Sequence, residues 1–113
     1  FDAVDGNGQH LGGVIAPGLA AMQKATLGAT RFETRDLSIP YTTELGTDTE
    51  SCVRQGALHA CAGLVERLGA RADGAKILSG GDAETLRPHL VQAWTLRPYL
   101  VLEGLQALAS GRG

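Results

Sequence analysis

The chain has 113 residues, a length that suits one domain with a single hydrophobic core. Its composition is 43% hydrophobic and 19% charged, which excludes a disordered or fibrous protein. The formal net charge of −2 comes without a basic run, and no apolar stretch approaches the roughly 20 residues of a membrane helix. We therefore expect a globular, cytoplasmic protein with no nucleic-acid or membrane partner.

A β-hairpin is predicted at the start of the chain. Residues 1–5 mix apolar and acidic side chains, Asp5-Gly6-Asn7-Gly8 is a strong turn signal, and residues 9–15 resume an extended pattern. Because residue 1 is Phe and a strand is already under way there, we expect the chain to be part of a longer protein.

Two helices are predicted next. Pro17 suits the first position of a helix, and apolar residues recur beyond it at helical spacing, namely Leu19, Met22, Ala25 and Ala29. Residues 31–46 are predicted to form a long connection. Thr47 followed by Glu50 fits a capping box for a helix that runs to Leu68 and stops at Gly69. The apolar stripe of that helix is predicted to consist of Val53, Ala57, Ala60, Leu64 and Leu68.

The rest of the chain alternates between short elements. A strand is predicted over residues 75–78, and Asp82 is placed to cap a helix over residues 83–90. A last helix is predicted over residues 98–109, with apolar positions at Leu100, Leu102, Leu105 and Leu108. Strands and helices are mixed without an internal repeat, so the fold class is α/β or α+β.

The cysteines and histidines predict neither a disulfide nor a metal site. Cys52 and Cys61 lie nine residues apart on one predicted helix, about 13 Å along its axis, which is too far for a bridge. The three histidines, His10, His59 and His89, have no spacing that is typical of metal ligands or a catalytic triad. His10 lies two residues before the glycine pair Gly12-Gly13, described next as a candidate binding segment, and is a candidate to contact a ligand there.

Three glycine-bearing segments each precede a predicted helix, where free backbone N–H groups suit a phosphate or carboxylate. They are Gly12-Gly13-Val14-Ile15-Ala16-Pro17-Gly18, Gly46-Thr47-Asp48-Thr49 and Ser79-Gly80-Gly81-Asp82. None matches a Walker or dinucleotide fingerprint, and a single segment of this kind is more often an ordinary turn than a binding site.

Taken in order, these segments resemble the carboxy-terminal half of type III pantothenate kinase, also called the Bvg accessory factor family. The most specific parts are Gly12-Gly13-x-Ile15-x-Pro17-Gly18 and the closing Leu100-Val101-Leu102-x-Gly104-Leu105. The resemblance implies an α/β, ribonuclease-H-like domain of the acetate and sugar kinase, heat-shock-cognate and actin superfamily, with a mixed sheet and flanking helices. Residues 1–113 are then expected to be the carboxy-terminal domain of a two-domain kinase whose amino-terminal half is missing.

The resemblance also implies a reaction and its partners. Family members transfer the γ-phosphate of ATP to pantothenate, giving 4′-phosphopantothenate in coenzyme A biosynthesis. They are homodimers that use ATP with Mg²⁺ and depend on a monovalent cation, K⁺ or NH₄⁺.

Site residues follow from the positions that match the family's motifs. Thr49 matches the threonine that reaches the partner's pantothenate, and Gly12, Gly13 and Ile15 match the loop that lines the pantothenate pocket. Ser79, Gly80 and Gly81 match a turn on the adenosine side. The alternatives are a plain capping Thr, a tight turn and an ordinary connection from strand to helix.

No catalytic residue or metal ligand is expected in this chain. The family's Asp-x-Gly-Asn-Thr loop, its Asp-x-Gly-Thr-Ala segment and the Gly-x-Asp-Arg segment that carries the general base are absent from it. We therefore expect no turnover from the 113 residues alone. The alternative is a non-catalytic dimerisation or regulatory module of the accessory-factor type. The helix over residues 47–68 is the candidate dimer contact, because small residues let helices approach closely, and it carries Ala57, Ala60, Ala62 and Gly63.

Overall fold

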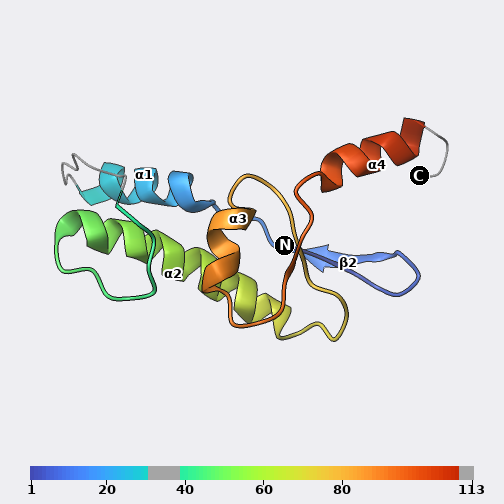
Figure 1. Cartoon of the computed structure of the whole chain (residues 1–113), viewed down its shortest axis with the longest axis horizontal. Helices are drawn as coiled ribbons and strands as arrows, with labels where there is room; N and C mark the ends of the chain where they lie inside the picture. Colours follow the sequence, from blue (N-terminus) through green and yellow to red (C-terminus); the bar gives the residue numbers. More distant parts are fainter. Residues whose placement is uncertain (31–38, 110–113) are drawn as a thin grey trace.

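A computed structural model describes residues 1–30 and 39–109 (Figure 1). The elements follow in the order β1 (Asp2–Val4), β2 (His10–Gly13), α1 (Leu19–Thr30), α2 (Thr49–Gly69), β3 (Ile77–Leu78), α3 (Ala83–Leu86), a 3₁₀ turn (Arg87–His89), β4 (Thr95–Leu96) and α4 (Leu100–Ala109). The mixed α/β class is therefore confirmed. Of the predicted connection over 31–46, residues 31–38 lie outside the described part of the chain.

The described strands form two separate two-stranded sheets, where the sequence predicted one mixed sheet. The antiparallel pair β1–β2 is the predicted hairpin, and its register pairs Asp2 with Gly13. Asp5 organises the turn, because its carboxylate accepts hydrogen bonds from the backbone N–H groups of Asn7 and Gln9, each at 2.9 Å. The second pair, β3–β4, is parallel, and β4 was not predicted.

Helix α1 begins at Leu19, two residues later than the predicted start at Pro17. Its first backbone hydrogen bond runs from Met22 N to Gly18 O at 2.9 Å, so Gly18 occupies the capping position. Pro17 therefore precedes the cap and is not the first helical residue.

Helix α2 is capped by Asp48 and Ser51, and not by the predicted pair Thr47 and Glu50. The Asp48 carboxylate accepts from Ser51 N at 2.8 Å, while the Ser51 hydroxyl accepts from Asp48 N at 3.2 Å. These bonds hold the pKa of Asp48 below its usual value. The predicted stop is confirmed, because α2 ends at Gly69.

Helix α2 and the residues around it form the core, in two clusters. The first cluster consists of Leu19, Ala57, Leu58, Cys61, Ala62 and Leu86. The second consists of Leu78, Ala83 and Trp94. The predicted stripe on α2 is wrong at Ala60, which is exposed, and Leu58 and Ala62 are buried in its place.

Helix α3 is shorter than the predicted helix over residues 83–90. Four α-helical residues are followed by a 3₁₀ turn that contains Pro88. Proline lacks an N–H group and its ring clashes with the preceding turn, so the α-helix cannot continue through it.

The β1–β2 hairpin and α4 extend away from the packed helices α1, α2 and α3 (Figure 1). Three of the predicted apolar positions of α4 are solvent-exposed, with relative exposures of 39% for Leu100, 61% for Leu102 and 57% for Leu105. The fourth position, Leu108, lies outside the residues whose side chains are described. The radius of gyration is 16.5 Å, against about 13 Å for a compact domain of this size. Within the described part of the chain, no helix combines the length and the apolar character needed to cross a membrane.

Candidate functional site

Two of the three glycine-bearing segments meet in space. The Asp82 carboxylate, which follows Ser79-Gly80-Gly81, accepts a hydrogen bond from the backbone N–H of Leu19 at 3.1 Å. A Cβ at Gly18 would lie only 2.8 Å from the same carboxylate oxygen, so glycine allows this approach. The start of α1 and the turn after β3 are therefore neighbours, although 63 residues separate them in sequence.

Asp82 does not cap its own helix, as the sequence predicted. It stands directly before α3, yet its side chain makes no capping hydrogen bond there. The carboxylate instead caps α1, which has no acidic residue in its own first turn. A carboxylate at this end is favoured by the free N–H groups and by the positive end of the helix dipole.

Cys61 on α2 lies close to the start of α1. Its Sγ donates to Pro17 O at 3.7 Å, and both burial and the nearby charge of Asp82 raise the pKa of the thiol. Cys52 is exposed, and both cysteines are free, which confirms the prediction of no disulfide. The buried thiol is thus a protonated core group.

The predicted residues Gly12 and Gly13 end strand β2, and Ile15 lies in the loop between β2 and α1. Gly12 has a φ of +132°, which side chains rarely adopt, and a Cβ there would meet no atom within 4 Å. Gly13 is required by strand pairing, because a Cβ would collide with Phe1 O and lie 2.7 Å from the Asp2 carboxylate. Ile15 is fully exposed, at 101%.

Thr49 is the first residue of α2 and is exposed. The alternative of a plain capping threonine is excluded, because Asp48 makes the cap. Twelve residues separate Thr49 from Cys61, which contacts Pro17 at the start of α1. At 1.5 Å per residue, this places Thr49 about 18 Å along α2 from that junction. Within one chain, Thr49 is therefore remote from the loop that carries Gly12 and Ile15.

The turn Ser79-Gly80-Gly81 leaves the carboxyl end of β3, which pairs in parallel with β4. Ligands of open α/β sheets bind outside the carboxyl ends of parallel strands. Gly80 adopts a φ of +100° and has open space at its Cβ position, while Gly81 is exposed. The turn therefore exposes Gly80 and Gly81 to solvent.

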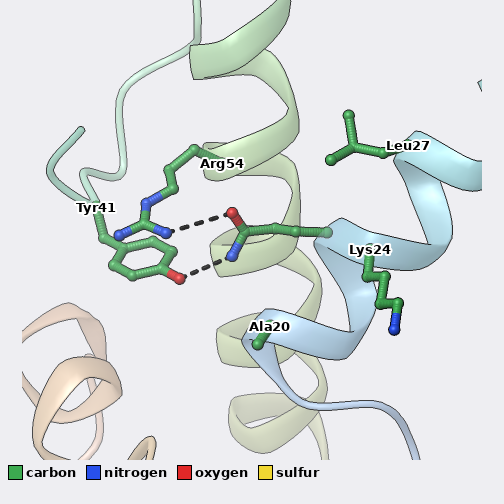
Figure 2. Close-up of a pocket in the computed structure, with 6 residues that line it drawn as sticks. Ala20, Lys24, Leu27, Tyr41 and Arg54 are labelled. Atoms are coloured by element: carbon green, nitrogen blue, oxygen red, sulfur yellow. Dashed lines mark hydrogen bonds between the residues drawn. The ribbon is translucent and has the colours of Figure 1, made fainter. Parts of the chain in front are cut away.

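A cavity of about 330 Å³ lies between α1, α2 and the segment that enters α2 (Figure 2). It is lined by Ala20, Gln23, Lys24, Leu27, Tyr41 and Arg54. Gln23 donates to the Tyr41 hydroxyl at 2.8 Å and accepts from Arg54 at 3.3 Å, and the Arg54 guanidinium stacks 3.7 Å over the Tyr41 ring. Arg54 also donates to Ile39 O at 2.9 Å.

These polar groups hold the connection against the helices. Gln55, which is buried, adds a donor bond to Pro40 O and an acceptor bond from Thr42 N. This cluster was not predicted from the sequence. Its signal was the placement of Gln23 four residues after the core residue Leu19, because a polar side chain on a buried helix face needs partners.

The histidines do not meet at a common centre. His10 pairs with Asp2 on the exposed hairpin at 2.9 Å, and His59 bonds to Thr43 O at 2.9 Å. Among residues 1–30 and 39–109, no group of three or more His, Cys, Asp or Glu side chains could hold a metal ion. The described residues therefore do not provide a set of ligands that fits Mg²⁺.

Comparison with known proteins gives one consistent result. A sequence model of the family described as type III pantothenate kinase matches residues 1–71. The type III pantothenate kinase of Nitrosospira multiformis is 37% identical over 117 residues, which cover 96% of this chain and 43% of that protein. Those of Dechloromonas aromatica and Thiobacillus denitrificans are 36% and 37% identical and cover 96% and 99% of this chain. The chain spans less than half the length of each of these three relatives.

Proposed function

Because this chain belongs to the type III pantothenate kinase family, we propose that it forms part of an enzyme that phosphorylates pantothenate with ATP. In this proposal, residues 1–113 are the carboxy-terminal domain of a two-domain kinase with ribonuclease-H-like architecture. The two separate small sheets would then belong to larger sheets in the complete domain.

The observation that carries the proposal is the segment formed by the end of β2 and the loop that leads to α1. It lies in the segment matched by the family model and combines open space at Gly12 with the fully exposed Ile15. Pantothenate has an apolar geminal dimethyl group beside an amide. An apolar side chain next to accessible backbone suits both parts, so Gly12, Gly13 and Ile15 are assigned to the pantothenate pocket.

Thr49 is assigned to the pantothenate bound by a second copy of the chain. Its hydroxyl is not used in the cap of α2, and the distance of about 18 Å along α2 separates it from the loop of its own chain. A homodimer is the arrangement in which both sets of residues reach one substrate. On α2, the small residues Ala60 and Gly63 are exposed and available for such a contact, whereas Ala57 and Ala62 are buried in the chain's own core.

The turn Ser79-Gly80-Gly81 is assigned to the adenosine side of ATP, since its two glycines are exposed beyond the carboxyl end of β3. Phosphoryl transfer depends on positioning and on neutralising charge, and Mg²⁺ bound to ATP supplies part of that charge. We assign no ligand of Mg²⁺ or of the monovalent cation, K⁺ or NH₄⁺, to the described residues of this chain.

The test is a pantothenate phosphorylation assay on a protein of full family length that carries this sequence, with ATP, Mg²⁺ and K⁺ supplied. We expect 4′-phosphopantothenate from that protein and none from the 113 residues alone, because the segment with the general base is absent from them. A folded, dimeric full-length protein without turnover would contradict the kinase proposal. That result would favour the accessory module.

A further inference from the structure

We propose that Asp82 is a positioning residue that couples the loop over residues 12–18 to the turn over residues 79–82. The identity of the two ligands rests on the proposed function, with pantothenate at the loop and ATP at the turn. The coupling itself rests on the hydrogen bond from Leu19 N to the Asp82 carboxylate, at 3.1 Å.

The contact depends on the identity of both Gly18 and Asp82. Gly18 leaves no Cβ to block the carboxylate, which would lie 2.8 Å from such an atom. Asp82 in turn leaves its own helix α3 without a side-chain cap. The Asp82 side chain therefore binds the start of α1, directly after the loop, and not the start of its own helix.

The core fixes the segments on both sides of the hydrogen bond between Leu19 N and Asp82. Leu19, which follows Gly18, is 2% exposed and packs in the same cluster as Leu86 of α3. A tightly packed cluster does not let one side slide while the other stays in place. A ligand that orders the turn will therefore also order the loop, and by linkage the reverse holds.

Because of the same contact, the start of α1 is not a binding site for an anionic ligand. The segment over residues 12–18 was expected to offer free N–H groups to a phosphate or carboxylate, but the first N–H of α1 already binds the Asp82 carboxylate. A second anion there would be repelled by that charge. The loop therefore serves a ligand through residues that precede Gly18, and the end of α1 serves the coupling.

The experiment compares a full-length protein carrying this sequence with three variants and one control. Asp82→Ala removes the acceptor, Asp82→Asn keeps an acceptor without the charge, and Gly18→Ala disturbs the contact from the other side. Glu84→Ala is the control, since Glu84 is an exposed acidic residue on α3, two residues after Asp82. The affinity for pantothenate is measured by calorimetry with and without a non-hydrolysable ATP analogue.

In the wild type and in Glu84→Ala we expect the analogue to tighten pantothenate binding severalfold, within the range typical of coupled sites. In Asp82→Ala and Gly18→Ala this factor should fall towards one, and in Asp82→Asn it should be intermediate. A variant that only lowers the melting temperature and keeps the factor would overturn the proposal, and so would a wild-type factor of one.

Amide hydrogen exchange separates this proposal from the assignment of substrates. Without any ligand, Asp82→Ala should speed exchange of the Leu19 amide and of the loop by about fivefold, as expected for the loss of a cap, whereas Glu84→Ala should not. If the wild type binds neither pantothenate nor ATP, the proposed function fails and exchange alone decides the coupling. Unchanged exchange in Asp82→Ala would then refute it.

Discussion

Gly69→Ala is expected to destabilise the chain, although alanine is the better helix former. Gly69 is the buried last residue of α2. A Cβ there would collide with the Gln92 side-chain oxygen and would lie 2.7 Å from Trp94 Cζ2. Contacts this short do not occur with real side chains, so Gln92 and the Trp94 ring must move.

The magnitude follows from the bonds that Gln92 makes. Its side-chain amide donates to Glu66 O at 3.0 Å and accepts from Trp94 Nε1 at 3.3 Å. Losing both costs about 2 kcal/mol, and displacing the buried ring adds about 1 kcal/mol. The helix propensity of alanine offsets about 1 kcal/mol, which leaves a net loss of about 2 kcal/mol. For 113 residues this lowers the melting temperature by about 8 °C.

The matched control is Gly56→Ala on the same helix, where the residue is exposed and a Cβ would meet no atom within 4 Å. It should raise the stability by about 1 kcal/mol, because only the propensity gain applies. Urea unfolding can be followed by the fluorescence of Trp94, which is the single tryptophan of the chain and is buried. If Gly69→Ala proves as stable as Gly56→Ala, the packing argument is wrong.

Three further predictions concern the binding residue, the core and the thiol. In the full-length protein, Thr49→Val should raise the KM for pantothenate more than the KM for ATP, because it removes a hydroxyl assigned to pantothenate alone. Leu58→Ala should cost about 3 kcal/mol in urea unfolding, since Leu58 is 0% exposed, whereas Leu102→Ala should change stability by less than about 0.5 kcal/mol. A thiol reagent should modify the exposed Cys52 in the native chain and Cys61 only on unfolding, and stability should fall as pH rises above 9.0, because the folded pKa of Cys61 is raised above that value.

Each of these has a result that counts against it. Equal effects of Thr49→Val on both KM values would indicate that the residue acts only through the start of α2. Similar losses for Leu58→Ala and Leu102→Ala would mean that the first core cluster is not as packed as its burial indicates. A Cys61→Ser variant that keeps the full decline in stability above pH 9 would assign that decline to another group.

The local elements could be predicted because their causes lie within a few residues. The turn signal from Asp5 to Gly8 predicts the hairpin, since the carboxylate binds N–H groups only two and four residues away. The start of α2 was predicted to within two residues. The wrong choice of Thr47 over Asp48 arose because both residue types can cap, and only the backbone geometry decides between them.

Elements that depend on distant partners were missed or placed wrongly. The strand β4 has only two residues and is defined by its pairing with β3, so no periodic pattern in the sequence predicts it. The polar cluster of Gln23, Tyr41 and Arg54 brings together three separate segments. Among the proposed site residues, Gly12, Ile15 and Thr49 could be named from the sequence by resemblance. The sequence could not place Thr49 about 18 Å along α2 from the start of α1.

The sequence by itself thus determined the hairpin, the extent of the long helix, the free thiols and the family. Tertiary structure alone decided where the Asp82 carboxylate goes. Its local partner was the start of α3, but burial of Leu19 and Leu86 in one cluster brings it to the start of α1, 63 residues earlier in the chain. Hydrogen bonds within a turn follow from neighbouring residues, whereas this one depends on which helices the hydrophobic core brings together.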